Sequence, residues 1–154
     1  INCQSTKIIG KSVGRAIVFS IDKLPFFVEA KDQCFPSLYA LWCLPTLLHA
    51  IHIQKPVIQA LLRGSDLMLP GIRGLDTPET TFPLSLKVGS IVSIHCGNDP
   101  IPAAVGVMLM SAQQIHNLQE RHGRVVRVLH ILNDHLWQMG EKWDYDEIVG
   151  INLG

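Results

Sequence analysis

Apolar residues along this chain gather in short runs separated by Gly, Pro, Asn and Asp, a pattern typical of short strands joined by turns. Residues 15–21 (RAIVFSI) and 24–29 (LPFFVE) are rich in β-branched and aromatic side chains, and they predict a β-hairpin. Residues 7–9 indicate an earlier strand. The start of the chain is therefore expected to contain neighbouring strands.

Residues 36–45 (PSLYALWCLP) predict a short helix after these strands. Leu38, Leu41 and Trp42 follow helical spacing, so they would lie on one face. Pro36 suits the first turn of a helix, and Pro45 would end it. The helix is expected to close a first unit, with a boundary near residue 50.

A second unit is expected to contain short strands and two inserted helices. The strands are predicted at residues 50–53, 66–69, 88–96, 101–110 and 124–132. Residues 75–83 (LDTPETTFP) have the composition of a loop, and residues 98–100 (Asn-Asp-Pro) predict a turn. A small mixed β-barrel with helical crossovers fits this order better than a doubly wound sheet, so the expected fold class is α+β.

The two inserted helices are predicted at residues 55–64 and 111–123. Pro56 suits the first turn of the earlier helix. The buried stripe of that helix is expected to consist of Ile58, Leu61 and Leu62. The later helix begins with a capping box, in which Ser111 and Gln114 satisfy the first backbone N–H groups.

Composition and charge are those of a globular protein. Hydrophobic residues make up 47% of the 154 positions, and no apolar run reaches the roughly 18 residues that a membrane-spanning helix needs. The formal net charge is zero, but residues 1–127 carry 12 Lys or Arg and 8 Asp or Glu (+4), whereas residues 128–154 carry 1 and 5 (−4). This asymmetry is compatible with an anionic partner on one face and equally with an ordinary mixed surface.

Seven histidines and four cysteines raise the question of a metal site. His49 and His52 are three positions apart across a predicted helix-to-strand junction, and His95 and Cys96, as neighbours on a strand, would point to opposite faces. No four ligands have a zinc-site spacing, so no metal is expected. The cysteines are expected to be reduced, and three of them to be small buried hydrophobes: Cys34, Cys43 and Cys96.

Signals for catalysis are weak. Cys96 has no Gly-rich elbow, and Ser65 lacks a G-x-S-x-G context. Asp134 and His135 could form an acid–base pair, or Asp134 could cap a helix by accepting backbone N–H bonds. The sequence therefore predicts no catalytic residue and no cofactor.

The segment LLRGSDLMLPGI, residues 61–72, is the strongest candidate for a binding site. Gly64 would end the first inserted helix in a left-handed conformation and leave its backbone bare. Pro70 and Gly71 fit a type II turn with positive φ at the glycine. Two bare points flanking one strand would let a phosphate or sugar approach the backbone, with Arg63 adding charge. The alternative is a helix stop followed by an ordinary turn.

Three further segments of the chain accompany this one: FPSLYALWCLP (35–45), AAVGVMLMSAQQI (103–115) and LHILNDHLW (129–137). Together with RGSDLMLPGI (63–72), they resemble the PUA-domain translation factors of the ligatin family, also called eukaryotic translation initiation factor 2D. The resemblance implies a partial N-terminal α/β domain at residues 1–49, packed on a PUA-type β pseudo-barrel at residues 50–140. Residues 141–154 would be a linker or a short final element. The chain, which starts at Ile1, would be a fragment without the first part of the N-terminal domain.

The resemblance also implies a function without a reaction. Members of the family bind small ribosomal subunit RNA and the acceptor end of tRNA in initiation, reinitiation or recycling. A cytoplasmic monomer without a membrane or a cofactor would follow. Two alternatives stay open. The chain could be the RNA-binding appendage of a tRNA-modifying enzyme, or a protein-interaction module. In the latter case the partner surface would be formed by Leu41, Trp42, Leu47 and Leu48, which could equally pack between the two domains.

The resemblance implies RNA contacts around the helix-ending glycine and the strand that follows it. These carry over to Arg63, Gly64, Ser65, Asp66, Pro70 and Gly71. The neighbouring basic positions Arg73, Arg121 and Arg124 complete the predicted site. If residues 124–132 form a regular strand, Arg124 and Arg127 lie on opposite faces, and only one of them should contact RNA.

Overall fold

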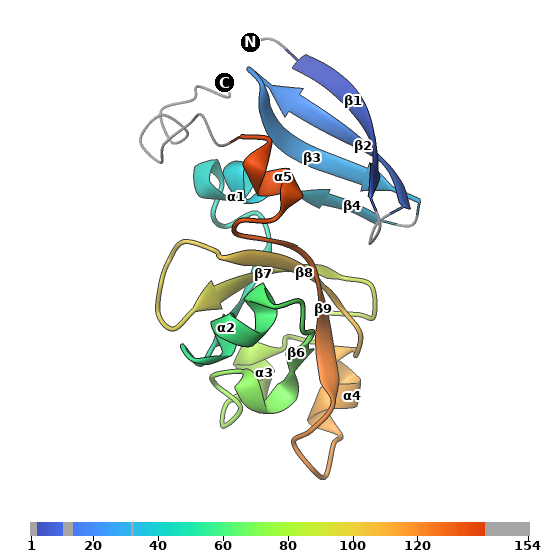
Figure 1. The fold of residues 1–154 in the computed structure, drawn as a ribbon. Coiled ribbons are helices and arrows are strands. Elements are labelled where there is room, and N and C mark those ends of the chain that lie inside the picture. The colour runs from blue at the N-terminus through green and yellow to red at the C-terminus, as the bar shows by residue number, and fades with distance from the viewer. Residues whose placement is uncertain (1–2, 11–13, 32, 141–154) are drawn as a thin grey trace.

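The computed structural model describes residues 3–10, 14–31 and 33–140, so the predicted linker at residues 141–154 lies outside the described residues. The described chain forms two β-sheets, one above the other in Figure 1, with short helices around them. The expected α+β class is confirmed.

The first sheet has four antiparallel strands in the order β1-β2-β3-β4. They are β1 (Cys3–Gly10), β2 (Gly14–Ile21), β3 (Leu24–Ala30) and β4 (Gln33–Pro36). Ile21 pairs with Leu24, so Asp22 and Lys23 form a two-residue loop, and both have the positive φ (50° and 69°) that a type I′ turn requires. The predicted hairpin and the earlier strand are confirmed.

Helix α1 (Leu38–Cys43) follows the first sheet, as predicted, but it begins later than expected. Pro36 is the last residue of β4 and does not lie in the helix. The N-cap is Ser37, whose side chain accepts the N–H of Ala40. A serine hydroxyl satisfies an otherwise unpaired N–H of the first turn, which is why the helix starts after it.

The second sheet has the order β5-β7-β8-β9-β6, with β5 parallel to β7 and the other neighbours antiparallel. Its strands are β5 (His49–Ile53), β6 (Leu67–Met68), β7 (Ile91–Cys96), β8 (Ala104–Met108) and β9 (Arg124–Ile131). All five predicted strands are present. The strand expected at residues 66–69 is shorter than predicted, because Leu69–Gly71 form a 3-10 helix, η1.

The helices of the second unit are short. They are α2 (Val57–Leu62), α3 (Pro78–Thr81) and α4 (Ala112–His116). The capping box of Ser111 and Gln114 is confirmed at α4. Residues 75–83 were expected to be a loop, but they contain α3, which has Pro78 at its start, where a missing N–H costs nothing. None of the helices in the described residues has the length and apolarity that a bilayer crossing requires.

The expected buried stripe of α2 is only partly correct. Leu61 is buried, and Ile58 is half-buried against the core of the second sheet. Leu62 is 41% exposed, contrary to the prediction. Consecutive residues of an α-helix point about 100° apart, so the face that buries Leu61 leaves Leu62 toward solvent.

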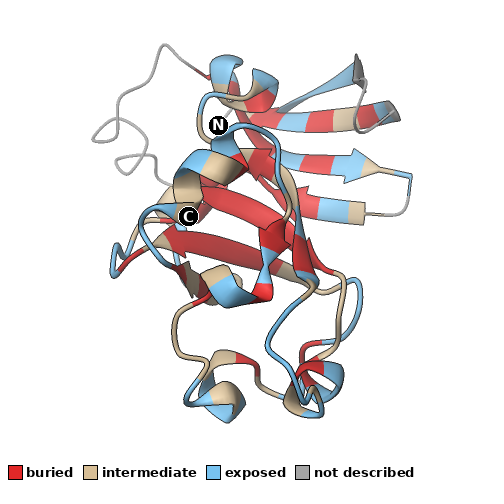
Figure 2. Cartoon of the chain, turned by 60° about the horizontal axis from the view of Figure 1, so that its bottom comes forward, coloured by how far each residue is buried: buried red, intermediate tan, exposed pale blue. Residues whose placement is uncertain are grey.

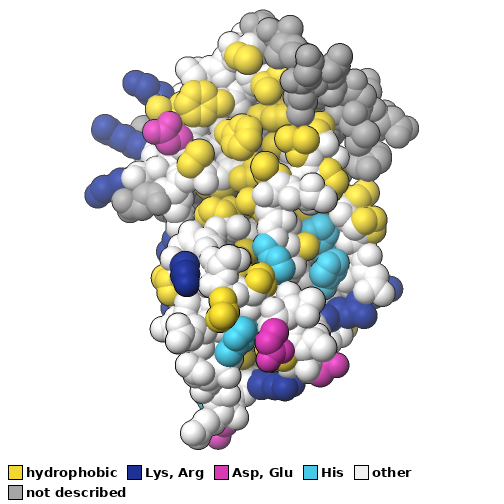
Figure 3. Space-filling model, turned by 180° about the vertical axis from the view of Figure 1, so that it is seen from behind, with side chains coloured by type: hydrophobic (Ala, Val, Ile, Leu, Met, Phe, Trp, Pro, Cys, Tyr) yellow, Lys and Arg dark blue, Asp and Glu magenta, His cyan; other side chains and the backbone are white. Residues whose placement is uncertain are grey.

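The first sheet buries one face and exposes the other. Phe19 and Phe27 pair across β2 and β3, and they are 41% and 36% exposed. Figure 2 shows exposed positions interleaved with buried ones along these strands. Figure 3 shows hydrophobic side chains gathered on the upper half of the rear face. The alternation of exposed and buried positions along the strands is typical of an antiparallel sheet with one packed face.

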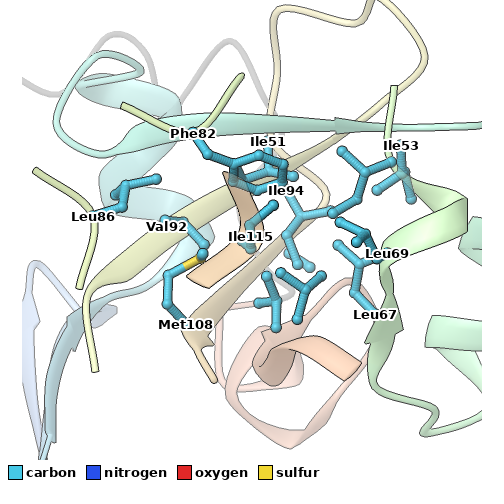
Figure 4. Packing of buried hydrophobic residues seen from close by; sticks show 14 of the residues in the cluster. Ile51, Ile53, Leu67, Leu69, Phe82, Leu86, Val92, Ile94, Met108 and Ile115 are labelled. Carbon is cyan, nitrogen blue, oxygen red and sulfur yellow. The ribbon is translucent and has the colours of Figure 1, made fainter. Parts of the chain in front are cut away.

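The second sheet surrounds the larger hydrophobic core. Strand β8 is buried along its whole length, and the central strands in Figure 2 are coloured as buried over most of their extent. Figure 4 shows how side chains from several elements meet there. The cluster includes Ile51, Ile53, Leu67, Leu69, Phe82, Leu86, Val92, Ile94, Met108 and Ile115. Burial of this apolar surface is the main term that stabilises the second unit.

The two sheets share a second hydrophobic cluster. Val28 and Phe35 of the first sheet, Val105 of β8 and Leu136 of α5 (His135–Gln138) all belong to it. Figure 1 shows α5 returning to the upper half of the molecule, beside α1. Helix α5 therefore ties the segment after β9 back to the first unit.

Three aromatic rings complete this contact. Trp137 stacks on Tyr39 with ring centroids 4.5 Å apart, and it meets Trp42 edge-on at 4.9 Å. Trp42 also donates its indole N–H to the carbonyl of Pro102 at 3.2 Å. Leu41 is fully buried and Leu48 packs against the shared cluster, whereas Leu47 is 46% exposed. Most of the apolar residues considered as a partner surface therefore pack within the chain.

Candidate nucleic-acid interface

Helix α2 ends in a Schellman motif centred on Gly64. The N–H of Ser65 donates to the carbonyl of Ala60 at 3.1 Å, and the N–H of Gly64 donates to that of Leu61 at 3.0 Å. Gly64 has a φ of 97°, as predicted, and a Cβ built on it would meet nothing within 4 Å. The glycine is therefore required by the backbone conformation, and the space above it is open.

The next residues join this helix end to the start of β9. Met68 pairs with Arg124, and the N–H of Leu69 donates to the carbonyl of Gly123 at 2.9 Å. The guanidinium of Arg124 forms an ion pair with the carboxylate of Asp66, with an N–O distance of 2.9 Å. Two segments far apart in the sequence thus form one surface.

Most of the predicted site lies on or next to this surface. In the connection from α2 to β6, Arg63, Gly64 and Ser65 are exposed and Asp66 is half-buried. Arg121 is exposed before β9, and Arg124 is exposed at its start. We call these six residues the Gly64 surface. It carries three arginines and one aspartate, so it is net basic. Arg73 is not part of it. The guanidinium of Arg73 donates to the side chain of Asn98 at 2.8 Å, and Asn98 belongs to the turn after β7.

Pro70 and Gly71 do not form the predicted type II turn. They belong to η1, and Gly71 is not among the glycines with positive φ. A Cβ on Gly71 would lie 3.1 Å from a methyl group of Val57. Gly71 thus packs closely against α2, and its backbone is not the bare point that the sequence predicts. Pro70 is exposed next to it.

A bulge in β9 changes the expected position of Arg127. Leu67 pairs with Val126 but Met68 pairs with Arg124, so Val125 is an extra residue in the ladder. Val125 and Val126 are consequently both buried, while Arg124 and Arg127 are both exposed. The extra residue places the two arginines on the same face, contrary to the prediction from a regular strand. Arg127 therefore extends the basic face of the Gly64 surface, and the consecutive valines of RVVR are the local sequence signal for it.

The histidines near β5 and β7 have structural partners. His49 and His52 both lie in β5, and not across a helix-to-strand junction as expected. Their ring N–H groups donate to the carbonyls of Thr81 and Gly97, each at 2.9 Å. His95 is buried between the carbonyl of Asp99 and the hydroxyl of Ser93. Burial lowers the pKa of His95, because a charged imidazole would lose its hydration there. Across the described part of the chain, no three His, Cys, Asp or Glu residues are arranged to hold a metal.

Asp134 caps a helix and does not pair with His135. Its carboxylate accepts the N–H of Trp137 at 2.8 Å, the N–H of Ile131 at 3.0 Å and a ring N–H of His130 at 2.7 Å. Burial alone would raise the pKa of Asp134, but the hydrogen bond and charge of His130 and the two backbone N–H bonds lower it overall. The capping interpretation of this aspartate is confirmed.

The cysteines are more exposed than expected. Cys3 and Cys34 are exposed, so the expectation of a buried Cys34 is wrong. It fails because Cys34 lies on the exposed side of the short β4. Cys43 and Cys96 are half-buried, and burial raises the pKa of the Cys43 thiol. Within the residues that the structure describes, the cysteines form no disulfide.

Comparison with known proteins identifies the family. A family model described as "elF2D, PUA domain" matches residues 48–135, which is more than half of the chain. Eukaryotic translation initiation factor 2D of Rattus norvegicus is 36% identical over 118 residues, which cover 77% of this chain and 20% of that protein. Translation machinery-associated protein 20 of Saccharomyces cerevisiae is 26% identical over 122 residues, covering 78% of this chain and 65% of that protein.

Solved structures share the fold. A hypothetical protein from Pyrococcus horikoshii has a TM-score of 0.66 at 22% identity, covering 90% of this chain and 80% of that chain. A conserved PUA domain protein from Thermoplasma acidophilum has a TM-score of 0.65 at 22% identity, covering 88% and 81%. The chain spans about a fifth of the length of the mammalian factor-2D relatives that it matches. From the family match, together with the fold, the chain belongs to the PUA-domain family of eukaryotic translation initiation factor 2D.

Proposed function

We propose that this chain is the RNA-binding part of a translation factor that acts on the small ribosomal subunit and on tRNA in initiation, reinitiation or recycling. It contributes binding and no reaction of its own. It works as a cytoplasmic monomer, with small ribosomal subunit RNA and the tRNA acceptor end as partners. Membership of the factor-2D family and relatives that are named translation factors support this proposal. We also propose the division into residues 1–49, 50–140 and 141–154; its first boundary lies one residue inside β5 (His49–Ile53), the first strand of the second sheet.

The observation that carries the proposal is the Gly64 surface. An exposed left-handed glycine leaves backbone uncovered, Arg63 precedes it directly, and Arg124 of β9 is paired with Asp66 two residues after it. Guanidinium groups bind phosphate oxygens through two parallel hydrogen bonds, and bare backbone lets a nucleotide strand approach closely. RNA contacts by Arg63, Gly64, Ser65, Arg121 and Arg124 follow from this combination, with Pro70 at the edge.

Asp66 limits the strength of this surface. Its carboxylate neutralises the guanidinium of Arg124 at a distance of 2.9 Å. Arg63, Arg121 and the neighbouring Arg127 form no ion pair with any described residue, so they remain available for phosphate. We therefore expect affinity of moderate strength that depends mainly on these unpaired side chains.

The test is binding of small ribosomal subunits, and separately of tRNA ending in CCA, to the wild type and to Arg63→Ala and Arg121→Ala. Each substitution should weaken binding about tenfold, the loss expected for one charged phosphate contact. Lys31→Ala is the matched control, because Lys31 is an exposed cation beside the first sheet. Melting temperatures should stay unchanged in all three variants. Binding that is unaffected by Arg63→Ala and Arg121→Ala would contradict the proposal.

The protein-interaction alternative is weaker. It required Leu41, Trp42, Leu47 and Leu48 to be available to a partner, but most of these side chains pack inside the chain. The RNA-binding appendage of a tRNA-modifying enzyme would use the same surface. A catalytic domain in the full-length gene product would favour that alternative over the translation factor.

A further inference from the structure

An open recess lies at the carboxyl ends of β5 and β7, away from the Gly64 surface. Because these two strands are parallel, the loops that follow them meet at one edge of the sheet. The recess has a volume of about 770 Å³. It is lined by Gln54, Lys55 and Pro56 after β5, by Gly97, Asn98, Asp99 and Pro100 after β7, and by Cys96 and Arg73.

Two cations line this recess without a carboxylate partner. Neither Lys55 nor Arg73 forms an ion pair with any residue that the structure describes, whereas Arg124 is paired with Asp66. Asp99 is the acidic residue of the lining, but one of its carboxylate oxygens accepts the N–H of Ile101 at 2.9 Å. The recess therefore holds positive charge that an anion could neutralise.

Arg73 is held in place before any ligand arrives, and the exposed Lys55 runs beside the turn at Gly97. The backbone N–H of Arg73 donates to the carbonyl of His52 at 2.8 Å, and its guanidinium is oriented by the side chain of Asn98 at 2.8 Å. The stem of Lys55 crosses Gly97, where a Cβ would lie 3.0 Å from its Cε. Gly97 has a φ of 60° and so brings the turn close to the lysine. A side chain that is already ordered loses less entropy when it binds.

A smaller recess of about 410 Å³ adjoins the first and shares Arg73 and Asn98 with it. Its remaining lining is His49, Ala50, His52, Gly74, Thr80 and Thr81. The histidine and threonine side chains among them are polar, and they are uncharged when the histidines are neutral. Figure 3 shows histidine side chains gathered in the lower half of the rear face, with Lys or Arg side chains nearby. A charged recess beside a neutral polar one matches a phosphate group joined to a nucleoside.

We propose that this double recess binds a phosphorylated nucleoside, with the phosphate between Lys55 and Arg73 and the nucleoside toward His52 and Thr81. The phosphate could belong to an RNA strand or to a free nucleotide. In the first case the site deepens the proposed function and rests on it, because one RNA strand would contact the Gly64 surface and this recess. Helix α2 connects the two, since Lys55 and Pro56 precede it and Gly64 ends it.

The test is amide chemical-shift mapping on the full chain with 5′-AMP, inorganic phosphate, adenosine and a short polyglutamate peptide. The signals of Gly97 and Asn98 should shift with 5′-AMP, shift less with phosphate and stay unchanged with adenosine. Lys55→Gln and Arg73→Gln should each weaken 5′-AMP binding about tenfold. Lys87→Gln, at an exposed lysine elsewhere on the chain, is the matched control. Arg73→Gln breaks the hydrogen bond to Asn98, whereas Lys55→Gln does not. If Arg73→Gln proves to be misfolded, Lys55→Gln still provides the test.

The outcomes separate this proposal from the proposed function. If RNA binding depends on Arg63 but Lys55→Gln changes neither RNA nor 5′-AMP binding, the recess proposal is wrong and the proposed function stands. If the wild type binds no RNA while 5′-AMP shifts the signals in a Lys55-dependent way, the proposed function is wrong and the recess is a nucleotide site. An equal response to polyglutamate would overturn the assignment to phosphate.

Discussion

The guanidinium of Arg124 lies 2.9 Å from the carboxylate of Asp66, and this ion pair joins the start of β9 to the connection between α2 and β6. The arginine side chain is 66% exposed and the aspartate side chain 21% exposed. The pair therefore contributes little to folding, because solvent screens a partly exposed pair. Its larger effect is to reduce the net positive charge of the Gly64 surface.

Asp66→Asn should strengthen RNA binding severalfold, because it releases Arg124 to contact phosphate. The free energy of unfolding should fall by no more than about 1 kcal/mol, the usual upper value for an exposed pair. Titrations of RNA and urea denaturation measure the two effects. Arg124→Ala in the Asp66→Asn background should return the affinity to the wild-type level or below. Weaker RNA binding by Asp66→Asn would count against the role given to Arg124.

Gly64→Ala should lower the free energy of unfolding by about 1 kcal/mol, because alanine resists the positive φ of this position. Gly64→Asn should cost less, since asparagine tolerates a left-handed backbone better than alanine does. No side chain stands near the added Cβ, so packing does not contribute. Urea denaturation of both variants measures the difference. Equal losses for alanine and asparagine would show that backbone conformation is not the reason for this glycine.

Gly106→Ala should be more damaging than Gly64→Ala, for the opposite reason. Gly106 lacks a positive φ, but its Cβ would lie 2.3 Å from a methyl group of Val126 and 3.0 Å from the carbonyl oxygen of Arg127. Neither backbone nor a buried valine can move away easily, so overpacking should cost about 1–3 kcal/mol or more. A melting temperature close to that of the wild type would refute the close packing of β8 on β9.

Stability should fall as the pH drops below about 6.5, the ordinary pKa of histidine. Burial lowers the pKa of His95 in the folded state, so between its folded pKa and the ordinary value the unfolded chain binds more protons. The free energy of unfolding therefore rises with pH through this window and levels off above it. His95→Gln should flatten the pH profile when both proteins are unfolded in urea between pH 5 and 8. Identical profiles would contradict a neutral buried His95.

Local sequence signals predicted most elements of the fold. Ser111 and Gln114 lie three positions apart and cap α4, and Gly64 ends α2, because both signals act on neighbouring residues. The helix start predicted at Pro36 is wrong, because the side chain of Ser37, directly after it, caps the first turn of α1. The type II turn predicted at Pro70 and Gly71 is wrong, because these residues belong to the 3-10 helix η1, where Gly71 packs closely against Val57.

The recess and the full extent of the Gly64 surface could not be predicted from the sequence. Lys55 and Gly97 are 42 positions apart, and they meet only because β5 and β7 pair in parallel. Arg124 and Arg127 share a face only because of the bulge at Val125. Both features depend on strand pairing across the sheet, which hydrophobic periodicity alone does not specify. Arg73 was assigned to the RNA site from its position in the sequence, and the fold places it at the recess.

The salt dependence of RNA affinity, measured for the wild type and for Arg63→Ala, tests the proposed RNA surface most directly. Each phosphate contact releases counterions, so the plot of log affinity against log salt should have a slope of about −2 to −4 for the wild type. Loss of one contact should make the slope of Arg63→Ala shallower by about 1, while Lys31→Ala keeps the wild-type slope. A wild-type affinity without salt dependence, or equal slopes for the wild type and Arg63→Ala, would contradict an RNA surface at Gly64.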